Sequence, residues 1–242
     1  MREDRTLVAS IILAIGVAIG GWSIGHGFVA GRQADRYVTV KGLAERDVKA
    51  DLALWPIRFV RTNDDLGQAQ QAIERDTRTV VAFLARHGID TTQVRRQNLQ
   101  VTDVMANAYR NGPVGARYIL TQQLMVRSSV PDTVLAASQQ VGELVQAGVV
   151  LTNEGGFTNG PTYLFTRLND FKPAMIGEAT ANAREAAEKF ATDSRSHLAG
   201  IRQASQGFFS ILPRDQAGGI SEESQVEKTI RVVTTISYSL ED

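Results

Sequence analysis

The stretch Leu52-Ala-Leu-Trp-Pro-Ile-Arg-Phe-Val-Arg61 predicts a β-strand, because apolar side chains recur at every second position along much of it. Trp55, Ile57 and Phe59 share one face of that strand and are expected in the core. Pro56 cannot donate a hydrogen bond to a neighbouring strand, so we expect the strand to lie at a sheet edge or to carry a bulge. A sheet with one buried face is therefore the starting point of the fold.

The elements on both sides of this strand predict an α+β protein. A strand at 37–43 precedes it, and a helix follows from Asp64 to Gly88, where glycine suits the left-handed cap. Further strands are expected at 94–105, 117–130, 149–152, 163–168, 201–212 and 230–240, and further helices at 131–145 and 169–198. The order ββαββαββαββ favours mostly antiparallel sheets with three helices over a Rossmann fold.

The longest expected helix, 169–198, has an apolar stripe that consists mostly of alanine. The stripe comprises Ile176, Ala179, Ala183, Ala186, Ala187 and Phe190. Such small side chains allow a helix to pack closely against a sheet. Phe208 and Phe209 are expected in the core, whereas 214–225 is expected to be a mobile loop.

Two histidines of the body, His87 and His197, each precede a glycine that is expected to end a helix. A cationic side chain in the last turn of a helix interacts favourably with the helix dipole. We therefore expect both histidines to have a capping role and no catalytic or metal-binding role.

The amino-terminal segment has no charged residue from Leu7 to Ile24, and the uncharged zone continues through Gly31. This length is roughly what a helix needs to cross a bilayer of ~30 Å. We expect residues 1–31 to be an uncleaved anchor and residues 32–242 to form the body, as one domain or two interlocked halves. The alternative is a signal peptide cut after Ala30, which would place Phe28 at a position that prefers a small residue.

Glycines in this segment predict contacts between membrane helices. Gly16 with Gly20, and Gly21 with Gly25, are small residues four positions apart, which let two helices approach closely in lipid. A third pair, Gly27 and Gly31, follows. The predicted partners are therefore the lipid bilayer and a second copy of the chain.

Charge and cysteine content exclude several functional classes. Acidic and basic residues number 26 each, so the chain has no overall basic field for nucleic acid. Cysteine is absent, which excludes disulfides and thiolate chemistry. No phosphate-binding, metal-binding or catalytic motif stands in a suitable context, so we expect no cofactor and no enzymatic activity.

One group of basic residues remains as a candidate binding site. Arg58, Arg61, Arg95 and Arg96 lie on two of the expected strands and could form a small patch for an anionic ligand. A solvated sheet face is the simpler interpretation of the same four residues.

Four stretches in the same order resemble the SIMPL-domain (YggE-like) family of bacterial envelope proteins. They are the opening strand and strand start at 38–53, the strand after a tyrosine at 118–127, the alanine-rich helix at 178–190 and the terminal strand at 232–240. The resemblance implies an α+β fold, export to the periplasm or cell surface, and assembly in some members. It implies no catalytic residues, because no agreed activity goes with the family.

Together these features predict a non-enzymatic protein that is anchored in the bacterial inner membrane by one helix, with its body in the periplasm. We expect it to self-associate and to have a structural or envelope stress-protective role. The alternatives are a secreted periplasmic protein, a periplasmic module for a small anionic ligand and, least supported, a hydrolase with a dispersed site.

Overall fold

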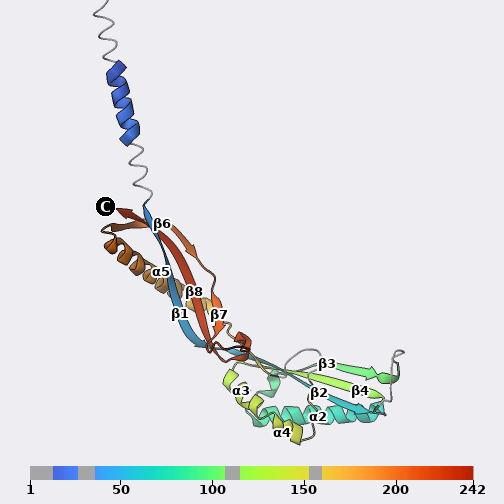
Figure 1. Cartoon of the computed structure of the whole chain (residues 1–242). Helices are drawn as coiled ribbons and strands as arrows, with labels where there is room; N and C mark the ends of the chain where they lie inside the picture. The colour runs from blue at the N-terminus through green and yellow to red at the C-terminus, as the bar shows by residue number, and fades with distance from the viewer. Residues whose placement is uncertain (1–12, 27–35, 107–114, 153–159, 242) are drawn as a thin grey trace, which may run out of the picture. The chain divides into compact units, whose positions relative to one another are not determined.

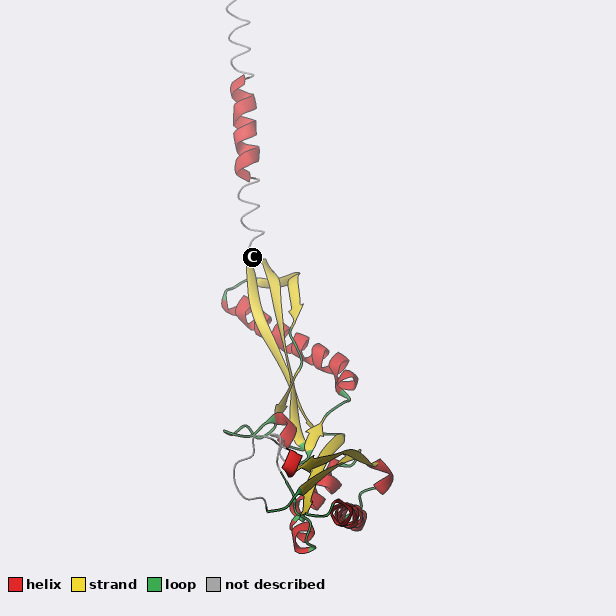
Figure 2. Ribbon diagram, turned by 90° about the vertical axis from the view of Figure 1, so that its right-hand side faces the viewer, coloured by secondary structure: helices red, strands yellow, loops and turns green. Residues whose placement is uncertain are grey.

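The computed structural model describes residues 13–26, 36–106, 115–152 and 160–241 (Figure 1). It divides the chain into two compact units, each assembled from separate stretches of sequence. The first unit consists of residues 1–45, 172–209 and 231–242, and the second of residues 46–171 and 210–230. Both contain antiparallel strands and helices, which confirms the predicted α+β class (Figure 2).

The first unit is built on a sheet whose central strand comes from the end of the chain. β8 (Glu227–Glu241) lies between β1 (Tyr37–Lys49) and β6 (His197–Gln206). β6 pairs antiparallel with β8, although its register shifts on both sides of Ile201. The helix α5 (Leu168–Asp193) runs alongside these strands (Figure 1). The sheet therefore joins parts of the sequence that lie far apart.

Helix α5 packs through a stripe of small side chains that repeats every fourth residue. Its buried members are Met175, Ala179, Ala183, Ala187 and Ala191. The three central alanines confirm the predicted stripe. Phe190, which was also placed in the stripe, is 58% exposed, because the row of buried positions continues through Ala191 instead.

Gly42 in β1 lies directly against the backbone of α5. A Cβ atom at this position would overlap the carbonyl oxygen of Ala179 and lie 2.6 Å from the backbone nitrogen of Ala183. The contact is therefore made by backbone atoms of the helix, and only glycine fits opposite them.

The second unit contains a sheet of strand order β3-β4-β2-β5. Its strands are β2 (Leu52–Asn63), β3 (Val94–Asp103), β4 (Tyr118–Ser128) and β5 (Thr162–Leu164), all paired antiparallel. The prediction that Pro56 places its strand at a sheet edge or in a bulge is wrong, because β2 is a central strand and pairs with β4 without a register shift. On its other side, β5 pairs only with residues 52–54. The proline therefore lies beyond the end of β5, where that strand requires no backbone N–H donor from it.

Three helices cover one face of this sheet: α2 (Leu66–Arg86), α3 (Pro131–Gln139) and α4 (Gly142–Gln146) (Figure 1). Trp55, Ile57 and Phe59 are buried in the core beneath them, as predicted. The carboxylate of Asp65 caps α2 by accepting from the backbone nitrogen of Gln68 at 2.8 Å. Among the described residues, no helix lies over the opposite face of the sheet.

Four further elements complete the second unit. β7 (Ser210–Pro213) pairs with β8, and the short 3₁₀ helices are η1 (Thr91–Gln93), η2 (Val104–Ala106) and η3 (Glu222–Ser224). The segment expected to be a mobile loop contains η3. In η3, the backbone carbonyl oxygen of Glu222 accepts a hydrogen bond of 2.7 Å from the ammonium group of Lys228, whose side chain is fully buried.

Helix number and helix ends differ from the prediction. Five helical segments occur in the part of the chain that the structure describes, not three plus an anchor, because the helix expected at 131–145 is divided into α3 and α4. At the break, the backbone amides of Gln140, Glu143 and Leu144 each bond to the carbonyl oxygen three residues earlier, instead of four as in an α-helix. Gly142, a weak helix former, starts α4.

His197 is not in a helix but in β6, opposite Glu241. Helix α5 ends at Asp193 because Arg195 adopts a left-handed conformation (φ 56°) and the next amide, of Ser196, bonds back to Ala191. The prediction had placed the end of this helix at Leu198, ahead of Gly200, since glycine is the usual residue for this conformation.

Two other predictions are corrected. The strand expected at 149–152 contributes only a single bridge, from Leu151 to Phe59. Phe208, expected in the core, is 96% exposed, since it lies in the short connection between β6 and β7.

Residues 13–26 form a helix whose side chains are all exposed. Within the described residues, no helix combines the length and the apolar character needed to cross a bilayer. Residues 1–12 and 27–31 of the expected anchor, with the cleavage point at Ala30, lie outside the described residues.

Candidate functional site

The four arginines of the predicted anion patch are not equivalent in the structure. Arg58 donates to the side chain of Gln123 at 2.7 Å, and Arg96 forms a salt bridge with Glu74 at 3.2 Å. Arg95 makes no hydrogen bond or ion pair with the residues that the structure describes. Three of the four guanidinium groups, Arg61 included, already have protein partners, which weakens the case for this patch.

Arg61 belongs to a half-buried ion pair beneath the sheet. It holds both carboxylate oxygens of Asp76 in α2, at 2.5 and 2.7 Å, and donates to the carbonyl of Gly148 at 2.7 Å. The hydrogen bonds from its guanidinium to Asp76 raise the pKa of Arg61. This arrangement ties β2, α2 and the residues after α4 together, so we interpret it as structural.

The predicted membrane-helix glycines Gly16, Gly20, Gly21 and Gly25 all lie in the helical segment 13–26. A Cβ atom added at any of them would meet no other atom within 4 Å. No part of the described chain covers these glycines.

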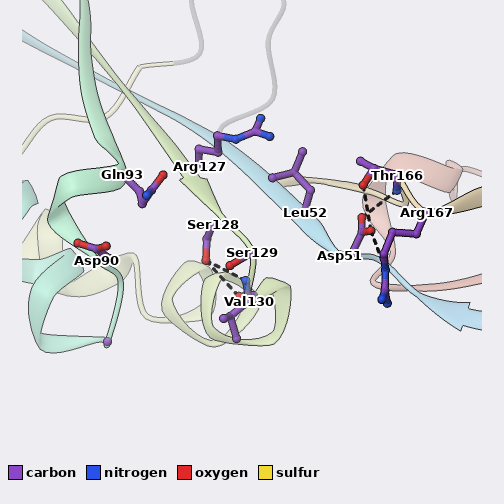
Figure 3. A pocket seen from close by; sticks show the side chains of 11 residues that line it. Asp51, Leu52, Asp90, Gln93, Arg127, Ser128, Ser129, Val130, Thr166 and Arg167 are labelled. Atoms are coloured by element: carbon purple, nitrogen blue, oxygen red, sulfur yellow. Dashed lines mark hydrogen bonds and ion pairs between the residues drawn. The ribbon is translucent and has the colours of Figure 1, made fainter.

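A different set of residues surrounds an open pocket of about 700 Å³ in the second unit. The pocket is lined by the end of β4, the start of β2, the segment after α2 and the segment after β5 (Figure 3). Its polar lining residues are Asp51, Asp90, Gln93, Arg127, Ser128, Ser129, Thr166 and Arg167. This volume is sufficient for a ligand of one or two sugar rings.

One side of the pocket is closed by a group of satisfied polar side chains. Asp51 accepts from the backbone nitrogen and the hydroxyl of Thr166, at 2.8 and 2.9 Å, and pairs with Arg167 at 3.3 Å. Figure 3 shows these three residues together, away from Asp90. The Asp51 carboxylate is thus used in holding the segment after β5, and Arg167 compensates its charge.

The other side contains Asp90, which accepts from the backbone nitrogen and hydroxyl of Thr92 at 2.9 and 2.7 Å. These hydrogen bonds lower the pKa of Asp90, so it is ionised at neutral pH. Among the described residues it has no cationic partner.

Arg127 stands between the two sides, beside Leu52 (Figure 3). It is exposed and makes no hydrogen bond or ion pair within the described ranges. The side chains of Gln93 and Ser129 are likewise without a partner there. The unused polar groups of the pocket are therefore mainly hydrogen-bond donors.

Sequence reasoning missed this pocket because its residues come from four separate elements. The alternation in the predicted strand 117–130 does place Arg127 opposite the buried Leu124 and Val126. No spacing in the sequence, however, links Arg127 to Gln93 or Asp51.

His87 is at the C-terminal end of α2, as predicted, and its Nε2 lies 3.2 Å from a carboxylate oxygen of Glu143. Contacts with His87 and Arg86 lower the pKa of Glu143. No group of three or more His, Asp or Glu side chains is placed to hold a metal in the described part of the chain.

Comparison with known families gives one match over most of the chain. The family model described as "SIMPL: Protein of unknown function (DUF541)" matches residues 38–238. This range covers both compact units. No curated protein matches the sequence.

Proposed function

Since this chain belongs to the SIMPL family, we propose that it is a membrane-tethered envelope protein that self-associates and has a structural or stress-protective role. The residues 1–31 are the tether, and the body is exposed in the periplasm. The family description assigns no activity, so the proposal depends on the features of this chain.

The observation that carries the proposal is the exposed apolar helix at 13–26. No described part of the chain buries its large side chains, and the exposed fraction is 72% for Trp22 and 76% for Ile24. An apolar surface of this kind is unfavourable in water, at about 25 cal/mol per Å². Because the sequence is uncharged from Leu7 to Ile24, a lipid bilayer is the environment that suits this surface.

Self-association is supported at two places. The glycines Gly16 and Gly20, and Gly21 and Gly25, leave open space beside the helix, where a second helix can approach closely. In the body, β3 is an edge strand, and its Leu99 and Val101 are 46% and 49% exposed. An unprotected edge with apolar side chains favours pairing with another chain.

A non-enzymatic role is supported by how the titratable groups are used. Arg61 and Asp76 are paired for structure, His87 contacts Glu143 at the end of a helix, and Asp51 holds a loop segment. Each of these contacts has a structural purpose that requires no reaction.

The test is crosslinking of the full-length protein in membranes. Replacing both Gly20 and Gly21 by Ile should reduce the crosslinked oligomer, because bulky side chains keep the helices apart. The control Val17→Ile adds a methyl group to the same helix without removing a glycine and should leave the oligomer unchanged. A wild-type protein that stays monomeric in crosslinked membranes and in mild detergent would contradict the proposal.

The body alone, residues 32–242, should be water-soluble and should form a smaller or looser assembly, because only one of the two contacts remains. A deletion strain should show increased sensitivity to envelope stress that the full-length chain restores and the body in the cytoplasm does not. Restoration by the cytoplasmic body would contradict the tether.

A further inference from the structure

We propose that the pocket around Arg127 binds a small, hydroxyl-rich ligand that carries a single carboxylate. This inference is independent of tethering and self-association, because every lining residue belongs to the second unit of one chain.

The charge of the ligand follows from which groups of the pocket are already satisfied. The Asp51 carboxylate has three donors, one of them the guanidinium of Arg167, and needs no further cation. Arg127 has no such partner among the described residues. A guanidinium offers several N–H donors in a planar fork that matches a carboxylate, so Arg127 is the group that selects an anion.

The number of negative charges is limited by Asp90. This carboxylate lines the same pocket and is stabilised by Thr92 alone, with no cation beside it in the described ranges. A ligand with two negative charges would bring the second one towards Asp90, where like charges repel. The pocket therefore favours a monoanion over a dianion.

The remaining lining favours a polar ligand body. Gln93 and Ser129 have unused side-chain hydrogen-bonding groups, which suit hydroxyl groups of a ligand. Leu52 and Val130 supply limited apolar surface between them. A sugar acid combines these properties and fits a pocket of about 700 Å³.

The chain offers a matched control for Arg127. Arg95 is also exposed and also lacks a partner in the described chain, and it pairs with Met125, two residues before Arg127 on the same face of the sheet. Arg95 does not line the pocket. Removing either charge changes the sheet surface similarly, but only Arg127→Gln changes the pocket.

The experiment is isothermal titration of the full-length protein in lipid nanodiscs with four probes of similar size and different charge: glucosamine, glucose, glucuronate and glucarate. We expect glucuronate to bind most tightly. Arg127→Gln should weaken glucuronate binding at least about tenfold, as expected for loss of a charged hydrogen-bonding partner. Arg95→Gln should change it less than about twofold.

Arg127→Lys retains the charge without the planar fork and should bind glucuronate with intermediate affinity. This variant also tests the proposal if Arg127→Gln does not fold. Absence of saturable glucuronate binding, equal binding of glucose and glucuronate, or equal effects of Arg127→Gln and Arg95→Gln would each overturn the proposal. None of these outcomes depends on whether the protein forms oligomers.

Discussion

Replacing Gly42 by Ala tests the close contact between β1 and α5 with the smallest possible change. The new Cβ would lie 2.6 Å from the backbone nitrogen of Ala183, compared with the 3.4 Å at which ordinary contact begins. The shortfall at this nitrogen is about 0.8 Å, and the overlap with the carbonyl oxygen of Ala179 is larger. Both contacts concern backbone atoms, so no side-chain rotation can relieve them. Helix α5 must shift, and its neighbours Ala179 and Ala187 are buried and must shift with it.

We expect this change to cost about 3 kcal/mol, the upper part of the range for overpacking. For a chain of this size the midpoint of thermal unfolding should fall by about 6–12 °C. The control is Gly200→Ala in β6 of the same sheet, where a Cβ would meet nothing within 4 Å. Circular dichroism during heating measures both. Equal midpoints for the two variants would show that α5 does not contact β1 through its backbone.

Three other substitutions test separate parts of the structure. Asp76→Ala should lower the free energy of unfolding, measured in urea, by about 3 kcal/mol, because it leaves Arg61 half-buried without its partner. The control Glu74→Ala removes the exposed pair with Arg96 and should cost less than about 1 kcal/mol. Equal costs for the two variants would contradict the structural role of Arg61. Arg195→Gly should stabilise the protein by about 1 kcal/mol, because glycine adopts the left-handed conformation without strain, and a lower urea midpoint would argue against that conformation. Hydrogen bonds from Arg117 lower the pKa of Asp103 from its usual 3.8. The stability from this pair is therefore complete above pH 3.8 and is lost as the pH falls through the lower folded-state pKa. Arg117→Gln should lower the melting midpoint at pH 7, and its difference from the wild type should shrink as the pH falls below 3.8. A pH-independent difference would refute this account.

The elements that were predicted well are those whose signals are local. Alternation identified β2 with its buried Trp55, Ile57 and Phe59, because strand side chains have a fixed period of two. The start of α2, expected at Asp64, lies at Leu66 behind the cap residue Asp65, and the helix ends before Gly88 as expected. Both ends follow from capping chemistry that involves only a few neighbouring residues.

The errors arise where a local rule has more than one solution. Arg195, rather than a glycine, adopts the left-handed conformation that ends α5. The helix expected at 131–145 is divided where backbone hydrogen bonds span three residues instead of four. Phe208 was assigned to the core by residue type alone, although burial depends on the connection it lies in.

The candidate site illustrates a further limit. Arg58, Arg61, Arg95 and Arg96 were grouped as basic residues on two expected strands, and the sequence could not show that Arg61 binds Asp76. The pocket residues Gln93 and Arg127 meet only because η1 and the end of β4 converge, which depends on the complete second unit.

The position of β8 between β1 and β6 has a consequence for how the protein is made. Thr39 in β1 and Ser237 in β8 are hydrogen-bonded neighbours that are 198 residues apart in the chain. At about 5–20 residues per second, the ribosome adds the second of them about 10–40 s after the first. Among the described strands, β8 is the only neighbour of β1, so this sheet cannot form while the chain is still being synthesised. A stop codon before Glu227 would remove the middle of that sheet, and even a short C-terminal truncation should be more damaging than its length suggests.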